Sequence, residues 1–355
     1  MNFILSADLH LNETEKEYSF SVLEEIITIC IREKCGLLLF AGDVFDSRGD
    51  TEKLRDDFRA ALEKLPSSCT VYFLPGNHED LRAKGDEKLE SFDFGRARLL
   101  SVKPYSLHEL NTDSELLAIP FQTDYSGYRQ WDVPPKTKAL RIVLAHGTVP
   151  GIAYTGPSEE TDGALDEDLF SYFKADIAAL GHLHSQYLDR KGDVLIAYPG
   201  SARVWREGES GKRSVLLGNT DTRLLVPILL ESAGEYHVIP VYVSPKGELR
   251  MNLPEHISQT DRLNLVFSGV VDDEPSVMND LKKLKTELEK KCRRVEHDTK
   301  AINVLEGISM HPLAISFLKA WEDDASRYAK EEPGVYELAR LQGLLVLKET
   351  LERRK

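Results

Sequence analysis

The sequence predicts an α/β fold for the N-terminal half of the chain, with smaller folded units after it. From residue 1 to about residue 180, short β-branched or leucine-rich runs alternate with amphipathic stretches, the pattern of strands joined by crossover helices. The length of 355 residues predicts two or three folded units, at about 150 residues per domain. Hydrophobic residues make up 41% of the chain, so most of it can bury a core.

Five apolar runs in this half are predicted to be buried strands, because both of their faces are apolar. They lie at residues 3–5, 37–40, 71–74, 142–144 and 177–180. Between the first two runs, apolar side chains recur at spacings of three and four residues and predict a helix over residues 17–34. We expect Gly36 to follow that helix as its C′ residue.

After Gly181 the pattern changes to short strands and turns. Apolar runs at residues 194–196, 215–217, 224–230 and 237–243 predict a second, antiparallel sheet. Proline and glycine then punctuate residues 243–259, which predicts a domain boundary. The last part of the chain is expected to form a strand at 263–271, a helix at 277–294, a strand at 295–302, and helices at 313–329 and 335–353.

The charge balance excludes a protein that coats nucleic acid passively. The chain has 59 acidic and 45 basic residues, which leaves a formal net charge of -14. A passive coat protein would be strongly basic. A phosphate-rich ligand would therefore have to be held by a local site.

The cysteines and the N-terminus predict a cytoplasmic protein. Cys30, Cys35, Cys69 and Cys292 form no CxxC pair and are typical of free thiols in a reducing compartment. Asp8 interrupts the first apolar stretch, so we expect no export signal. No apolar run approaches the roughly 20 residues that a membrane-spanning helix needs, so we expect no membrane partner.

Polar side chains gather directly after the five predicted strands. The segments are Asp8-Leu9-His10, Gly42-Asp43 with Asp46, Gly76-Asn77-His78-Glu79, His146-Gly147 and Gly181-His182-Leu183-His184. Each segment alone would be ordinary turn chemistry. Their occurrence in order after five strands indicates one shared site, because ligands in open α/β sheets bind at the carboxyl ends of the strands.

This donor set predicts a pair of divalent metal ions. Imidazole, carboxylate and amide oxygen without thiolate suit manganese, iron or zinc. One ion would have too many ligands, so we predict two ions bridged by Asp43. The predicted ligands are Asp8, His10 and His184 for one metal, and Asn77, His146 and His182 for the other.

A metal pair of this kind points to phosphodiester hydrolysis. Two metals neutralise the phosphate oxygens and lower the pKa of bound water from about 15.7 toward neutrality. His78 lies beside a predicted ligand and is the candidate general acid or transition-state donor. Two interpretations of Asp46 stay open, a carboxylate that orients a ligand and a residue at a helix N-terminus.

The other histidines and the tryptophans lack a comparable context. We interpret them as surface or packing residues: His108, His237, His256, His297, His311, Trp131, Trp205 and Trp321.

Together the five motifs resemble those of the calcineurin-type metallophosphoesterases. A closer resemblance, to the SbcD-type double-strand-break repair nucleases, is carried by residues 42–46 (Gly-Asp-Val-Phe-Asp), 179–184 (Ala-Leu-Gly-His-Leu-His) and 198–201 (Tyr-Pro-Gly-Ser). Two departures are Glu79, where the family usually has Asp, and residues 47–51, which lack the usual proline-containing stretch.

The resemblance implies a fold, a cofactor and an activity. The fold is a four-layer αββα sandwich with a small α+β capping domain and a C-terminal helical segment. The cofactor is a pair of divalent metal ions. The resemblance favours Mn²⁺, and Fe or Zn are the alternatives. His78 matches the family's catalytic histidine, and the activity is exonuclease and endonuclease action on DNA ends.

The resemblance also divides the chain and suggests partners. We expect a nuclease domain at residues 1–245, a capping domain at 246–305 and C-terminal helices at 306–355. The predicted helix at 277–294 carries a local surplus of four positive charges. These charges either dock DNA phosphates or form a solvated face, and we slightly favour the solvated face. The last helices resemble the segment that holds an SMC-like coiled-coil ATPase of the SbcC type, and docking on their own domain is the alternative. A homodimer is left open.

Three functions therefore compete. The first is the nuclease subunit of an SbcC/SbcD-like complex in DNA end processing and repair. The second is a stand-alone dinuclear-metal phosphodiesterase acting on nucleotides or nucleotide sugars. The third is a non-enzymatic adaptor, which should have lost ligands, whereas this sequence keeps them all.

Overall fold

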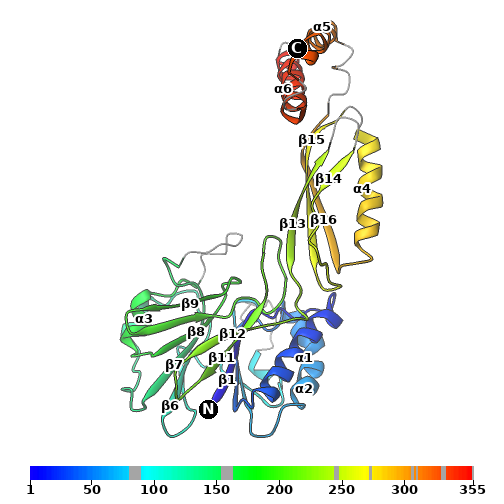
Figure 1. Ribbon diagram of the computed structural model, residues 1–355. Helices are drawn as coiled ribbons and strands as arrows, with labels where there is room; N and C mark the ends of the chain where they lie inside the picture. The colour runs from blue at the N-terminus through cyan, green and yellow to red at the C-terminus, as the bar shows by residue number, and fades with distance from the viewer. Residues whose placement is uncertain are drawn as a thin grey trace. The chain divides into compact units, whose positions relative to one another are not determined.

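The structure, a computed structural model, divides into two units, Met1–Tyr236 and His237–Lys355 (Figure 1). It describes residues 1–79, 89–152, 163–243, 248–271, 274–304, 308, 311–328 and 333–353. The boundary expected at residues 245–246 lies outside the described residues.

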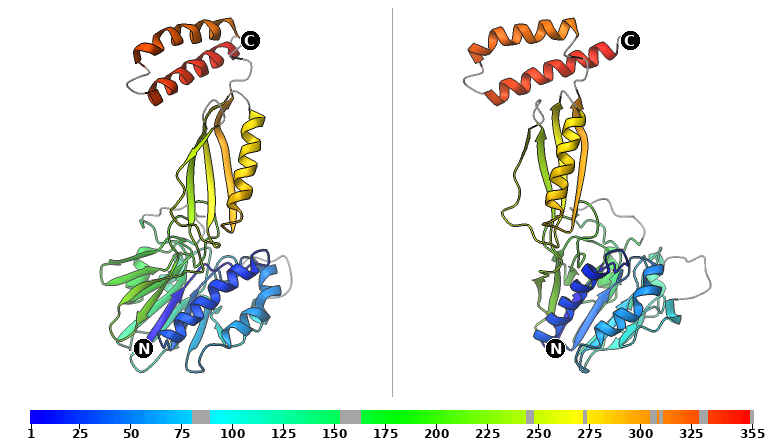
Figure 2. Two further views of the ribbon diagram at one scale, coloured as in Figure 1. Left: turned by 45° about the vertical axis from the view of Figure 1, so that its right-hand side comes forward. Right: turned by 90° about the vertical axis from the view of Figure 1, so that its right-hand side faces the viewer.

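The first sheet of unit 1 has six strands in the order β12-β11-β1-β2-β3-β4. These are β1 (Asn2–Ser6), β2 (Leu37–Ala41), β3 (Thr70–Leu74), β4 (Ala97–Leu99), β11 (Ser214–Asn219) and β12 (Leu225–Leu229). Strands β1 to β4 are parallel, whereas β11 is antiparallel to β1 and to β12. Helices α1 (Lys16–Arg32) and α2 (Arg48–Leu62) lie on its outer face (Figures 1 and 2).

The second sheet also has six strands, in the order β5-β6-β7-β8-β10-β9. These are β5 (Ser106–Glu109), β6 (Ser114–Ile119), β7 (Leu140–His146), β8 (Ile177–Gly181), β9 (Tyr187–Lys191) and β10 (Val194–Tyr198). The four inner strands are parallel, and β5 and β9 run antiparallel at the edges. The short helices η1 (Leu89–Ser91), η2 (Ser126–Gln130) and α3 (Glu167–Tyr172) complete the unit.

An apolar layer joins the two sheets. Leu5 and Leu39 from the first sheet and Leu144 and Ala179 from the second belong to one buried cluster. The outer faces of the sheets carry separate clusters, beneath α1 and α2 on one side and around α3 and η2 on the other. Helices therefore enclose two facing sheets, and the predicted α/β sandwich is confirmed.

Two local predictions are wrong. Gly36 does not end α1, because Lys34 takes the left-handed conformation after the helix, with φ 51°. The amides of Lys34 and Cys35 bond back to the carbonyls of Ile31 and Cys30, and these bonds hold the lysine there.

The second error concerns the strands after Gly181, which form no separate antiparallel sheet. β10 joins the second sheet parallel to β8, whereas β11 and β12 extend the first sheet. The run at 237–243 belongs to unit 2. A short apolar run shows that a strand forms but not which strand it pairs with, because pairing depends on residues far away in sequence.

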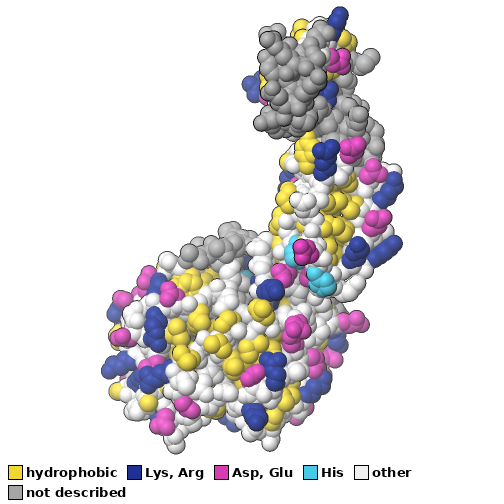
Figure 3. All heavy atoms as spheres, in the orientation of Figure 1, with side chains coloured by type: hydrophobic (Ala, Val, Ile, Leu, Met, Phe, Trp, Pro, Cys, Tyr) yellow, Lys and Arg dark blue, Asp and Glu magenta, His cyan; other side chains and the backbone are white. Residues whose placement is uncertain are grey.

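β12 is an edge strand with an apolar outer surface. Leu224, Val226 and Leu229 are exposed, and Figure 3 shows hydrophobic side chains gathered over this part of unit 1. Pro227 lies within β12, and an edge position tolerates it because proline has no N–H to donate.

Unit 2 contains a four-stranded sheet in the order β14-β13-β15-β16. Its strands are β13 (Tyr236–Val243), β14 (Leu249–Met251), β15 (Arg262–Val271) and β16 (Arg294–Val304). Helix α4 (Glu274–Leu288) connects β15 to β16, which are parallel, in the predicted order of strand, helix and strand. Helices α5 (Pro312–Tyr328) and α6 (Pro333–Glu352) follow and share a small apolar cluster. Within the part of the chain described above, no helix is long and apolar enough to cross a membrane.

Candidate metal centre

The carboxyl ends of parallel strands from both sheets bring the predicted site residues together. Asp8 and His10 follow β1, Asp43 follows β2, and Asn77 and His78 follow β3. From the second sheet, His146 ends β7, and His182 and His184 follow β8. The two aspartates and the four predicted histidine ligands are at most 7% exposed.

The backbone at these strand ends is strained. Asp8 (φ 50°), His10 (φ 45°), Asp43 (φ 51°) and His182 (φ 97°) all lie in the left-handed region, which non-glycine residues seldom adopt. Gly42 is needed beside them, because a Cβ at this position would overlap the ring of His146. Such strain persists only where the surrounding structure enforces it, and here it turns polar side chains inward.

One set of donors consists of Asp8, His10 and His184. The Nε2 atoms of His10 and His184 are 3.3 Å apart, and His184 Nε2 is 3.9 Å from Asp8 Oδ1. His184 Nδ1 bonds to the buried Glu209 carboxylate. That contact directs Nε2 toward Asp8 and His10, as in histidines that ligate metals.

A second set consists of Asp43, His146 and His182, together with Asn77. Asn77 Oδ1 lies 3.0 Å from His146 Nε2 and 3.1 Å from His182 Nδ1. His146 Nε2 is 3.4 Å from Asp43 Oδ2, and its Nδ1 donates to the Ala41 carbonyl at 2.7 Å. In each set the ligand atoms of the acidic and histidine residues lie within 4.8 Å of one another.

Burial and mutual charge shift the pKa values of these groups. Burial raises the pKa of Asp8 to about 7. Burial also opposes ionisation of Asp43, but His146, His78 and His10 hold its pKa well below the usual range. Burial alone would lower the pKa of His146, but the Asp43 carboxylate raises it to about 10. The ionisation of these carboxylates and imidazoles is therefore set by burial and by one another's charge.

The donor chemistry fits divalent metals. Oxygen and imidazole nitrogen donors converge in two adjacent sets, without thiolates, which suits manganese, iron or zinc. The two sets contain the residues that the sequence hypothesis gives to two ions. The placing of the ions, with Asp43 as the bridge, stays a prediction.

His78 and Asp46 form the accessible side of the site. Their side chains are 18% and 25% exposed. His78 Nδ1 donates to the Asp46 carbonyl at 2.6 Å, and its Nε2 lies 3.9 Å from Asp43 Oδ2. Asp46 Oδ1 is 3.5 Å from His10 Nδ1, and Ser47 rather than Asp46 caps α2. Of the two interpretations of Asp46, the helix N-terminus is therefore not supported, and its carboxylate lies beside His10 and His78.

Glu79 holds the loop of Asp43 in place. This buried carboxylate accepts hydrogen bonds from the amides of Asp43 (3.0 Å), Phe45 (2.8 Å) and Gly76 (2.9 Å). It therefore ties the end of β2 to the end of β3. The family's usual Asp is one methylene shorter, and here the longer Glu makes all three bonds.

Three further residues support the site and were missed from the sequence. Buried Arg203 donates to the carbonyls of Leu9 (2.8 Å) and His10 (2.5 Å) and so fixes the strained loop after β1. Glu209 bonds to His184, and Arg213 donates to the carbonyls of His184 and Glu209. No sequence motif around Arg203, Glu209 or Arg213 predicts this role, because their hydrogen-bond partners lie in loops far away in sequence.

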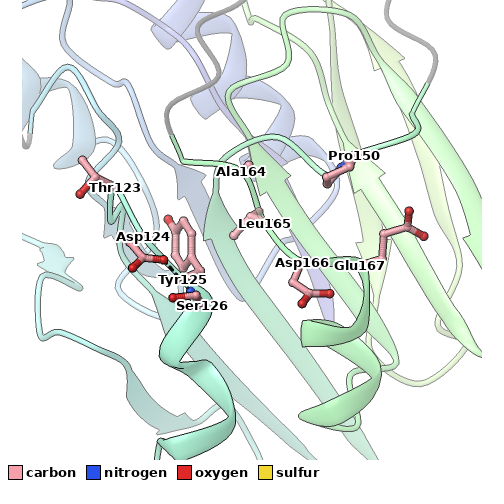
Figure 4. A pocket seen from close by; sticks show the side chains of 9 residues that line it. All are labelled: Thr123, Asp124, Tyr125, Ser126, Pro150, Ala164, Leu165, Asp166 and Glu167. Atoms are coloured by element: carbon pink, nitrogen blue, oxygen red, sulfur yellow. Dashed lines mark hydrogen bonds between the residues drawn. The ribbon is translucent and has the colours of Figure 1, made fainter.

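A separate cavity of about 500 Å³ lies in the loops around η2 and α3 (Figure 4). Asp124, Asp166 and Glu167 are among the residues that line it. Three carboxylates would repel a phosphate group. We therefore assign phosphodiester chemistry to the strand-end site and not to this cavity.

The N-terminal part of the chain is similar to known proteins. Residues 1–186 match the family model of the calcineurin-like phosphoesterases. The chain is 25% identical over 211 residues to the DNA double-strand break repair protein Mre11 of Thermoplasma acidophilum, which covers 57% of this chain and 54% of that protein. It is 26% identical over 222 residues to Mre11 of Methanocaldococcus jannaschii, and the match covers 58% of this chain and 57% of that protein.

A third relative is the uncharacterized metallophosphoesterase YhaO of Bacillus subtilis. It is 24% identical over 249 residues, with 61% of this chain and 57% of that protein covered. The chain thus spans little more than half the length of the curated relatives that it matches.

Mn²⁺ binding should release protons and tighten as pH rises from about 6 to about 8. Without metal, Asp8 holds a proton below its pKa of about 7, and His146 holds one below about 10. Both must lose it to ligate a cation, so each proton released should lower the Kd roughly tenfold per pH unit. Calorimetry in two buffers of different ionisation enthalpy measures both effects. Equal affinity across this range without proton release would contradict the pKa assignments.

The Asp43→Asn variant should lose at least one of two bound Mn²⁺ ions while remaining folded. It keeps the side-chain volume but removes the carboxylate that faces His146. The matched control is His108→Gln, because His108 lies outside the site and contacts Ser106. Metal content after dialysis, with circular dichroism as the folding check, measures the difference. Two ions retained in Asp43→Asn would exclude Asp43 as the bridge.

Proposed function

The chain belongs to the calcineurin-like phosphoesterase family, and from this premise and the geometry of its strand ends we propose that it is a two-metal phosphodiesterase that hydrolyses DNA. The observation that carries the proposal is the convergence of two adjacent donor sets at the carboxyl ends of both sheets. We further propose that it acts on DNA ends, as the nuclease subunit of an SbcC/SbcD-like repair complex.

The proposed ligands would create a local positive site in an acidic protein. The proposed cations are Mn²⁺, with Fe or Zn as alternatives. Bound to these ligands, they would neutralise the phosphodiester oxygens and lower the pKa of bound water. Asp8 and Asp43 would fix the cations, and the bond from His184 to Glu209 would hold one ligand ring in register. The net charge of -14 makes this local attraction necessary.

His78 is suited to the proton transfer that the leaving oxygen needs. Its Nδ1 is committed to the Asp46 carbonyl, which leaves Nε2 directed toward the site. Unlike the predicted histidine ligands, it is partly exposed, so it can meet a substrate that enters from solvent. As an imidazolium it would protonate the leaving oxygen or stabilise its developing charge.

DNA is favoured over small phosphoesters by the relatives and by the resemblance of Tyr198-Pro199-Gly200-Ser201 to the nuclease pattern. Two of the relatives are named as DNA double-strand break repair proteins. Ser201 bridges to Ala7 beside the first ligand, and Ala202 donates to the Ala7 carbonyl at 3.2 Å. This segment therefore supports the site directly. The second candidate, a stand-alone phosphodiesterase for nucleotides, shares the metal site and differs in substrate.

The C-terminal helices supply a surface for the proposed ATPase partner. Ala314, Leu341 and Leu344 bury one face between α5 and α6. Leu313, Ile315 and Val346 remain exposed on the same two helices. A coiled coil of the SbcC type would cover apolar residues of this kind.

Helix α4 is a weaker candidate for a DNA contact. Figure 3 shows basic and acidic side chains interspersed along it, and Lys283 and Lys285 pair with Asp280 and Glu289. These pairs favour a solvated face. A DNA-binding role for the unit is a proposal that rests on the family resemblance.

Mn²⁺-loaded protein should hydrolyse linear duplex DNA with a higher kcat/KM than bis-p-nitrophenyl phosphate or mononucleotides. Binding energy from a long substrate is expected to stabilise the transition state at the metals. Turnover of the three substrates at equal metal concentration measures this. Efficient turnover of nucleotides with none of DNA would select the stand-alone phosphodiesterase, and no turnover of any would support the adaptor.

The His78→Gln variant should keep both metals and lose about 10²- to 10⁴-fold in kcat on DNA, the usual contribution of a general acid. Glutamine preserves a polar side chain but cannot carry the transferable proton. Metal content and single-turnover DNA cleavage are measured together. Full turnover by this variant would reject the acid role, and lost metals would make His78 a ligand.

A further inference from the structure

Trp205 extends the site outward from a predicted metal ligand. Its indole stacks on His10, with ring centroids 3.9 Å apart and planes inclined by 5°. It also lies 5.4 Å from the ring of His78 and 5.6 Å from that of His184. The expectation that Trp205 is a packing residue therefore misses its position, because it packs on the site itself.

Arg206 contacts the same indole. Its guanidinium carbon lies 4.3 Å from the ring centroid of Trp205. The indole of Trp205 thus contacts both a predicted metal ligand, His10, and a cationic side chain.

The backbone beneath this stack is firmly held. The Trp205 amide donates to Glu209 at 2.9 Å, and Glu209 in turn bonds to His184. Arg203, two residues before Trp205, is buried and donates a hydrogen bond to the Leu9 carbonyl in the loop after β1. Trp205 and Arg206 are therefore placed relative to the ligands by the same contacts that orient the ligands.

The charge of Arg206 is available for a ligand. Arg203 and Arg213 are buried and bond to carbonyls of the site loops, whereas Arg206 is only half-buried. Within the described ranges, its guanidinium lies over the Trp205 ring and forms no ion pair. A guanidinium stacked on an aromatic ring keeps its in-plane N–H donors for bidentate binding of phosphate. Aromatic and arginine side chains together are typical of grooves that follow a single strand of nucleic acid.

We propose that Arg206, supported by Trp205, binds a phosphate that neighbours the scissile one in a polynucleotide. The residue would then set the preference for polymeric DNA over substrates with a single phosphodiester. This inference rests on the proposed phosphodiesterase function and deepens it, because it names the group that recognises the chain beyond the cleaved bond.

The test compares a substrate that has neighbouring phosphates with one that has none. Arg206→Met should lower kcat/KM about tenfold on a single-stranded ten-residue oligothymidylate, mainly through KM, and leave bis-p-nitrophenyl phosphate unchanged. Methionine retains an aliphatic contact with the indole, so loss of packing is small. Arg206→Lys should recover part of the loss, since it restores the charge but not the planar fork.

Arg190→Met is the matched control. Arg190 is an exposed arginine on β9, opposite Leu195 near the start of β10, and so at the end of the strand away from the ligands. Loss of the Arg190 guanidinium should leave kcat/KM unchanged on both substrates. Arg206→Met, but not the control, should also reduce the slope of log KM against log salt on the oligonucleotide by about 0.7, the effect of one phosphate contact on a single strand.

Each outcome decides the proposal. An equal loss on both substrates would make Arg206 structural, and unchanged kinetics on both would exclude a phosphate contact; either result overturns the inference while the phosphodiesterase function stands. A wild-type protein that cleaves linear duplex DNA but neither of these two substrates would overturn the inference alone, and one that also fails to cleave duplex DNA would overturn the proposed function with it.

Discussion

The buried carboxylate of Asp43 is the group on which the site depends. Its amide donates to Glu79, its carbonyl accepts from the His10 amide at 2.9 Å, and its Oδ1 accepts from the His78 amide at 2.9 Å. One residue thus joins the loops after β1, β2 and β3. A buried charge without partners is costly, and breaking a buried ion pair typically costs about 3–5 kcal/mol. The loops that close around Asp43 supply those partners.

The second sheet is equally necessary, because it supplies three of the predicted ligands. The apolar layer that contains Leu39 and Leu144 sets the separation of the sheets. At the edge of this layer, the bond from His146 Nδ1 to the Ala41 carbonyl links the end of β7 to the end of β2. Packing of the core therefore also sets the geometry of the site, and glycine is required at position 42, where a Cβ would overlap the ring of His146.

The sequence predicts the parts of this arrangement that depend on local pattern. Apolar runs followed by polar turns locate the strand ends, and parallel strands bring their carboxyl ends to one edge of a sheet, so the meeting of Asp8 with Asp43 follows from this rule. The meeting of Asp8 with His184 does not, because β1 and β8 belong to different sheets. Pairing after Gly181 could not be predicted, because β11 joins β1 through contacts across the whole unit. Lys34 rather than Gly36 ends α1 because hydrogen bonds outweigh the intrinsic preference for glycine. Arg203 and Glu209 carry no local signal, since their partners are the carbonyl of Leu9 and the ring of His184.

Two cations should lie on either side of Asp43. Anomalous diffraction at the manganese edge from crystals soaked in Mn²⁺ measures this directly. We expect two peaks about 3.5–4 Å apart, one next to Asp8 and His184 and the other next to Asn77 and His146. A single peak, or strong peaks only at exposed carboxylates such as those of the cavity in Figure 4, would contradict it.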